Sequence, residues 1–136
     1  MRLRLVDSVR EQSADRIVAD HLVSPDDDYL EDHFAGFPVL PGVLMLETMV
    51  RAARRLIARR DPAFGRHVLA AVRALKYGAM VRPGQTLVVE VALLKETEPG
   101  VFDFKGVGTV RAEDGADDKP RTAVSGRFTL RPIRKG

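Results

Sequence analysis

The sequence contains no cysteine, which excludes disulfide bonds, thiol nucleophiles and cysteine-ligated metal sites. It also has no stretch that approaches the ~18 apolar residues of a membrane-spanning helix. The first fifteen residues mix charged and apolar side chains without a long apolar run, so they do not predict a secretory signal. Together these absences predict a cytoplasmic protein with no membrane span.

The chain also has only a small excess of positive over negative charge. The chain carries 22 lysines and arginines against 19 aspartates and glutamates, for a net charge of +3, which does not indicate a nucleic-acid partner. The basic residues nevertheless gather in one segment, at Arg51, Arg54, Arg55, Arg59 and Arg60. Such a cluster is either a solvated helix face or a surface that docks an acidic partner.

The composition of the 136 residues, 45% hydrophobic and 30% charged, favours one globular domain over residues 1–136. Period-2 patterns and apolar runs predict strands over residues 16–23, 67–76, 86–95, 101–111 and 122–131. The last three follow one another through short turns, so they are expected to be antiparallel neighbours. The run over 67–76 is apolar enough for a buried strand. Two glycines inside the fourth predicted strand, Gly106 and Gly108, indicate a bulge or a close backbone approach.

One segment has a helical pattern. After Pro41-Gly42, apolar residues recur with i, i+3, i+4, i+7 spacing, which predicts an amphipathic helix over 43–60 that stops at Asp61-Pro62. Its first half is apolar almost all round, with Glu47 as the one charged residue, so the helix should start buried and emerge at its basic end. A long helix with consecutive antiparallel strands predicts an α+β domain.

The segment between His33 and Glu47 is unusual. Pro38, Pro41 and Gly42 fix its backbone, yet apolar residues fill the remaining positions, whereas a solvent loop would be polar. The segment is therefore expected to be buried or to line an apolar cavity. A carboxyl on an apolar wall has a reason to stay protonated, and a nearby neutral imidazole can accept a proton. The pair offers the acid and base that a β-elimination of water requires.

The helix start at Gly42 and Val43 adds free backbone N–H groups, which could polarise a thioester carbonyl and stabilise an enolate. Taken singly, His33 is as well explained as a hydrogen-bonded loop histidine, and Glu47 as a helix glutamate paired with Arg51. The pattern that joins them favours the catalytic interpretation.

That pattern reads HFxGxPxxPGVLxxE from His33 to Glu47, and it is followed by RPGQTL at 82–87 and KGVGTV at 105–110. The opening LVDSV at 5–9 belongs with them. In these motifs the sequence resembles the 3-hydroxyacyl-acyl carrier protein dehydratases of fatty acid synthesis, in the shorter type that pairs histidine with glutamate. The resemblance covers nearly the whole chain.

The resemblance implies a hot-dog fold, in which a curved antiparallel sheet wraps a long central helix. It implies a homodimer, or a trimer of such dimers, with histidine and glutamate supplied by different chains. His33 then removes the α-proton and Glu47 protonates the departing 3-hydroxyl. Gly42, Val43 and Phe34 bind the substrate, and the Gly42 N–H meets the thioester carbonyl. No metal or organic cofactor is implied.

The activity implied is dehydration of (3R)-hydroxyacyl thioesters, carried by acyl carrier protein or coenzyme A, to trans-2-enoyl thioesters in fatty acid or related lipid synthesis. Three positions depart from the family pattern: Asp32 replaces glycine, Ala35 replaces proline and Arg51 replaces glutamine. Arg51 lies one helical turn beyond Glu47, where a contact would favour the ionised carboxylate and weaken it as an acid. An acyl thioesterase and a non-catalytic acyl-thioester-binding subunit therefore remain alternatives.

Overall fold

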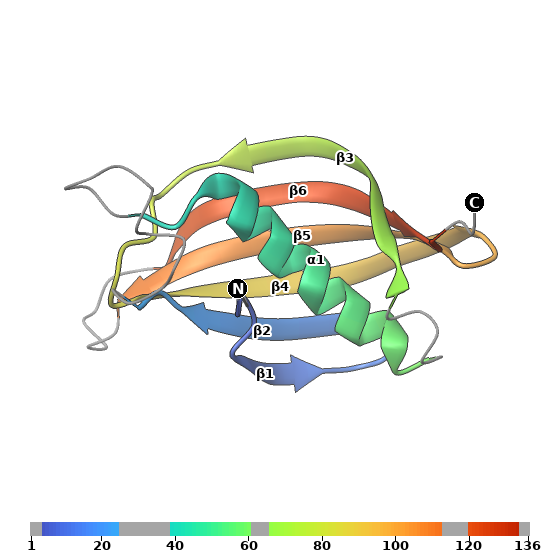
Figure 1. Cartoon of the computed structure of the whole chain (residues 1–136), viewed down its shortest axis with the longest axis horizontal. Coiled ribbons are helices and arrows are strands. Elements are labelled where there is room, and N and C mark those ends of the chain that lie inside the picture. Colours follow the sequence, from blue (N-terminus) through green and yellow to red (C-terminus); the bar gives the residue numbers. More distant parts are fainter. Residues whose placement is uncertain (1–3, 25–38, 61–65, 113–119, 134–136) are drawn as a thin grey trace.

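A computed structural model describes residues 4–24, 39–60, 66–112 and 120–133. Within these residues the chain forms six strands and one helix, in the order β1 (Ser8–Gln12), β2 (Arg16–Leu22), α1 (Gly42–Ala58), β3 (Val68–Tyr77), β4 (Gln85–Glu98), β5 (Val101–Ala112) and β6 (Arg121–Arg131). The helix lies across one face of a single sheet that contains all six strands (Figure 1). No helix in the described segments is long and apolar enough to cross a membrane.

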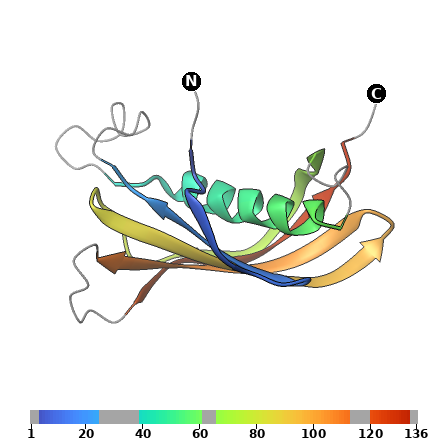
Figure 2. The ribbon, with the colours of Figure 1, turned by 90° about the horizontal axis from the view of Figure 1, so that it is seen from below.

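The strand order in the sheet is β1-β2-β4-β5-β6-β3, and every neighbouring pair is antiparallel. The predicted run of three consecutive antiparallel strands is confirmed as β4, β5 and β6. The sheet curves, and α1 lies on its concave side (Figure 2). The expected α+β architecture of a long helix wrapped by a curved antiparallel sheet is therefore confirmed.

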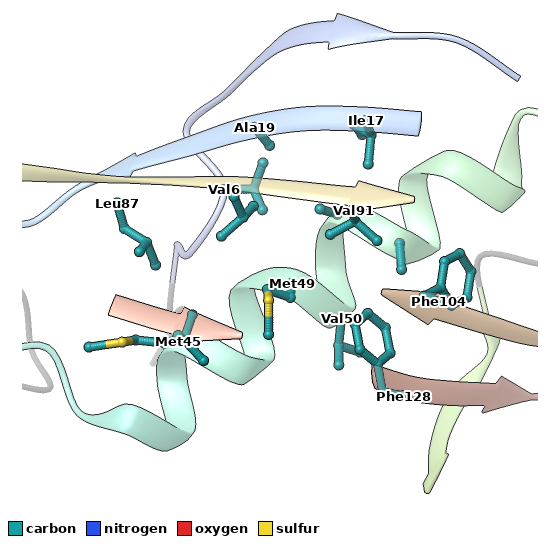
Figure 3. Close-up of a cluster of buried hydrophobic side chains, with 14 of the residues drawn as sticks. Val6, Ile17, Ala19, Met45, Met49, Val50, Leu87, Val91, Phe104 and Phe128 are labelled. Atoms are coloured by element: carbon teal, nitrogen blue, oxygen red, sulfur yellow. The ribbon is translucent and has the colours of Figure 1, made fainter. Parts of the chain in front are cut away.

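The core forms where the apolar stripe of α1 meets the inward face of the sheet. Met49 and Val50 of the helix lie among Val91, Phe104 and Phe128 of three strands (Figure 3). The rings of Phe104 and Phe128 stack with their centroids 5.3 Å apart. The side chains that alternate along these strands are excluded from solvent, which is the physical origin of the period-2 pattern in the sequence.

The glycine in β5 confirms the predicted close approach of two elements. A Cβ atom added at Gly106 would lie 2.5 Å from Sδ of Met49, far inside van der Waals contact. The missing side chain thus lets α1 lie directly against the middle of the sheet. A register shift in the β5–β6 pairing follows Gly108, so a strand irregularity accompanies the second glycine as well.

Two burial predictions are wrong for the single chain. The strand over 67–76 was expected to be buried, but β3 is an edge strand outside the area that α1 covers, and most of its side chains are exposed. The helix start was also expected to be buried, but Val43 is 66% exposed. The polar strand β1 was not predicted, because its side chains are nearly all exposed and lack alternation.

Candidate active site

The first turn of α1 presents unbonded amides. The helix begins after Pro41, which provides no side-chain cap. The N–H groups of Leu44 and Met45 both donate to the Pro41 carbonyl, at 3.0 and 3.2 Å. The preceding amides, of Gly42 and Val43, have no hydrogen-bond partner among the described residues. The helix start is therefore able to donate hydrogen bonds to a ligand oxygen, and its dipole favours negative charge there.

The ring of Tyr77 packs directly on this turn. A Cβ atom at Gly42 would lie 2.9 Å from Cε1 and Cζ of Tyr77, so only glycine fits under the ring without displacing it. Sequence reasoning missed Tyr77, because it lies at the far end of β3 and reaches the helix only through the fold. The aromatic residue just before Gly78 carried no local signal of that contact.

An open cavity of about 500 Å³ lies beside the helix start. Its walls are mostly apolar and include Leu40, Gly42, Val43, Met45, Tyr77 and Met80. Leu40 and Met45 are buried and form the inner wall, whereas Val43, Tyr77 and Met80 are 66%, 51% and 54% exposed and form the rim. The apolar surroundings that the sequence predicted for the proline-containing segment are present at its helical end. A cavity of this size and lining suits a small apolar ligand.

Glu47 lies in the second turn of α1, and its side chain is 35% exposed. Its Oε1 atom is 3.5 Å from Nε of Arg51 and 3.3 Å from Nη1 of Arg54. The contact expected between Glu47 and Arg51 is therefore present. The second partner, Arg54, was not predicted as a partner of Glu47, although residues seven apart also share one face of a helix.

The predicted partner of Glu47 lies outside the described residues. His33 and Phe34, and the departures at Asp32 and Ala35, all fall within residues 25–38. The chain has three histidines. The other two, His21 and His67, are buried and do not line the cavity at the helix start.

Both of these histidines hold structural positions. His21 Nδ1 lies 3.3 Å from a carboxylate oxygen of Asp7, which ties β2 to the segment before β1. His67 Nε2 lies 2.5 Å from the Gly100 carbonyl at the β4–β5 turn. Neither His21 nor His67 lines the cavity, so His33 remains the predicted base.

The basic end of α1 differs from the expected cluster in two residues, Arg51 and Arg54, which both contact Glu47. Arg55, Arg59 and Arg60 are exposed. The side chain of Arg54, by contrast, is only 29% exposed and is engaged by Glu47 and by the main chain of His67. The exposed basic surface therefore consists of Arg55, Arg59 and Arg60, joined by Arg4 across a groove beside the helix.

Comparison with known proteins gives several matches to dehydratases. A family model described as "ApeI-like: ApeI dehydratase" matches residues 9–115. The 3-hydroxyacyl-[acyl-carrier-protein] dehydratase FabZ of Thermus thermophilus is 34% identical over 128 residues, covering 93% of this chain and 85% of that protein. FabZ of Petrotoga mobilis is 28% identical over 109 residues, covering 80% and 78%.

Two solved structures share the architecture. The dehydratase heterocomplex ApeI:P from Xenorhabdus doucetiae superposes with a TM-score of 0.64 at 17% identity, over 92% of this chain and 95% of that one. An uncharacterised protein from Erwinia carotovora subsp. atroseptica gives 0.63 at 25% identity, over 92% and 90%. They confirm the hot-dog fold that the motifs implied. With most of its length matched by the family model, the chain belongs to the ApeI-like dehydratase family.

Proposed function

We propose that the chain removes water from (3R)-hydroxyacyl thioesters to give trans-2-enoyl thioesters, with Glu47 and His33 as the catalytic pair. The observation that carries this proposal is the arrangement of residues in the first two turns of α1. Glu47 lies one helical turn beyond Val43, which lines the apolar cavity and whose amide, like that of Gly42, has no hydrogen-bond partner among the described residues. The names of the FabZ relatives describe the same reaction on substrates held by acyl carrier protein.

Each part of the site has a role in the elimination. The thioester carbonyl accepts a hydrogen bond from the Gly42 N–H, which stabilises the negative charge that develops on that oxygen. The imidazole of His33 removes the α-proton, and the electron pair of the broken C–H bond forms the new double bond. Glu47 gives its proton to the 3-hydroxyl as the C3–O bond breaks, and water leaves. The proton gained by His33 passes to solvent, and Glu47 regains one for the next cycle.

The surfaces around the cavity support a homodimer. Val43, Tyr77 and Met80 form an exposed apolar rim, and the neighbouring strand β3 has β6 as its one partner strand among the described residues. Both features attract a partner chain. We infer that a second copy covers them and brings its own His33 to Glu47, with Phe34 beside the substrate. The ApeI:P structure is a heterocomplex, so a related but different chain is the competing partner.

The exposed arginines support a substrate whose acyl group is attached to a carrier protein. Arg55, Arg59 and Arg60 lie at the end of α1 away from the cavity, and within the described part of the chain none of them forms a salt bridge with a carboxylate. A surface of this kind steers an acidic protein toward the site and loses strength with salt. We infer that an acidic acyl carrier protein docks there rather than free coenzyme A.

The proposal is tested with a 3-hydroxyacyl thioester of N-acetylcysteamine and detection of the enoyl product. His33→Ala and Glu47→Gln should each lower kcat by ~10²–10⁴-fold, the usual loss for a missing general base or acid. Glu11→Gln, on an exposed carboxylate of β1, is the matched control and should keep wild-type turnover. Mixing the two inactive variants under conditions that exchange subunits should restore part of the activity, because one site of the mixed dimer has both groups.

The alternatives give different outcomes in the same assay. Release of free acid identifies a thioesterase. Substrate binding without turnover, across several chain lengths, identifies a non-catalytic subunit. Activity that appears only after a second hot-dog chain is added identifies a heterocomplex.

A further inference from the structure

Arg54 joins the carboxyl of Glu47 to the backbone of the sheet. Its Nη1 lies 3.3 Å from Glu47 Oε1, and its Nε donates a 2.7 Å hydrogen bond to the carbonyl of His67. Both bonds come from one planar guanidinium, whose donors have a fixed relative geometry. The position of the Glu47 carboxyl is therefore tied to the residue that precedes β3.

The anchor at His67 is itself held firmly. The side chain of His67 is 3% exposed, and its ring packs on Phe102 with centroids 5.8 Å apart. The same ring contacts the Gly100 carbonyl at the β4–β5 turn. The carbonyl that receives the Arg54 bond thus belongs to a buried residue held by β5 and by the β4–β5 turn, and side-chain motion of Arg54 is restricted accordingly.

The two oxygens of Glu47 are not equivalent. Arg51 and Arg54 both engage Oε1, at 3.5 and 3.3 Å. Within the described residues no hydrogen bond or ion pair reaches Oε2. The carboxyl is therefore held through one oxygen while the other remains open for a ligand.

We propose that Arg54 is a positioning residue that fixes Glu47 by Oε1 and directs Oε2 toward the departing hydroxyl. This inference rests on the proposed role of Glu47 as the acid. Proton transfer requires the donor to lie within hydrogen-bond reach of the leaving oxygen, and a misplacement of about 1 Å can lower the rate ~10²-fold. Arg54 does not touch the reacting atoms and acts through Glu47.

The position of Arg54 gives a test that separates geometry from charge. Arg54→Gln should lower kcat by roughly 10- to 100-fold on the N-acetylcysteamine substrate, with the Michaelis constant changed less than about two-fold. Arg54→Lys should be nearly as impaired, because one ammonium cannot reproduce the forked contact to Glu47 and the His67 carbonyl. Arg127→Gln, an exposed arginine on the sheet face away from α1, is the matched control and should match wild type.

Opposite results overturn the inference. If Arg54→Lys keeps wild-type kcat, or if Arg54→Gln and Arg51→Gln change turnover in the same direction and amount, Arg54 acts only as a charge. Thermal melting shows whether each variant folds. If Arg54→Gln does not fold, the comparison of kcat with wild type is made on Arg54→Lys, which keeps a cation beside the carbonyl. Glu47→Gln measured alongside separates the two proposals. Full activity of that variant rejects Glu47 as the acid, whereas its inactivity beside fully active Arg54 variants rejects only the role of Arg54.

Discussion

The two ends of α1 have opposite chemistry. The first turn carries no charged side chain, and its residues Gly42 and Val43 lie beside an apolar cavity next to the ring of Tyr77. The last turns carry a row of guanidinium groups, of which Arg55 and Arg59 face solvent. One element therefore combines an apolar cavity with a basic surface, and we have proposed that the first binds the acyl thioester and the second an acidic carrier protein.

Glu47 lies at the boundary between these two environments. Its helix position places it one turn from the free amides, while its carboxyl is held by arginines from the basic half. The proposed roles assign substrate binding and carrier docking to opposite ends of one helix. Substitutions at each end should therefore change different kinetic constants.

The largest effect is expected at the apolar end. Gly42→Ala adds a methyl group where Tyr77 ring atoms lie 2.9 Å from the Cβ position, so the ring must move into the cavity and displace the thioester. We expect kcat/KM on the small thioester to fall about 10²-fold. The melting temperature should change little, because the ring is half exposed and its displacement leaves the buried core intact. Gly42→Ala combined with Tyr77→Ala should recover much of the loss, and full activity of Gly42→Ala alone would contradict the assignment.

The basic end should affect the carrier alone. Arg55→Glu with Arg59→Glu should raise the Michaelis constant for a carrier-bound substrate by roughly ten-fold or more at low salt, because attraction becomes repulsion. The constant for the small thioester should stay within about two-fold. Arg111→Glu with Arg127→Glu, on the opposite face of the sheet, is the matched control. Equal effects on both substrates would show that these arginines form a solvated helix face and do not dock the carrier.

A smaller change is expected at the boundary. Arg51→Gln removes one of the two guanidinium groups that contact Oε1 of Glu47. The family that the sequence resembles has glutamine at this position, so we expect turnover to rise by about a few-fold at neutral pH when that residue is restored. Steady-state kinetics of both the wild type and the variant provide the measurement. A loss of turnover would show that Arg51 supports the site instead of opposing it.

The smallest effect is expected at Asp20 of β2, away from α1. It tests whether loss of activity is specific to substitutions in the helix. Burial alone would raise the pKa of Asp20, but hydrogen bonds from Arg10 and Ser8 outweigh it and hold this pKa below its ordinary value. The carboxylate therefore stabilises the fold above its unfolded pKa, and this contribution is lost as pH falls through the folded value. Asp20→Asn should cost at most about 1 kcal/mol at neutral pH and nothing at strongly acidic pH, with kcat unchanged. Chemical denaturation at several pH values measures this.

Local spacing predicts much of the molecule. The alternation of Leu87, Val89 and Val91 is visible in sequence because every second side chain enters the core. The contact between Glu47 and Arg51 also follows from helical spacing alone. Helix and strand periods are properties of neighbouring residues, so one sequence contains them.

Contacts that β3 creates could not be predicted in this way. The bond from Arg54 to the His67 carbonyl and the packing of Tyr77 on Gly42 both depend on where an edge strand passes the helix. The burial of that strand was predicted wrongly for the same reason, since apolar composition does not distinguish a central strand from an edge strand that faces a partner. The pairing of Glu47 with His33 stays a prediction.

The strand order also sets the sequence of events during synthesis. β3 emerges from the ribosome well before β6, yet β6 is its only neighbour in the described sheet, with Val68 opposite Arg131 and Tyr77 opposite Val124. Long-range pairings of this kind form late because distant segments must first meet. A nascent chain can assemble α1 on β2, β4 and β5 while His67 and Tyr77 still lack their final places. We therefore expect the growing polypeptide to form first the part of its core that α1, β2, β4 and β5 contribute, and the proposed site to remain inactive until β6 is added.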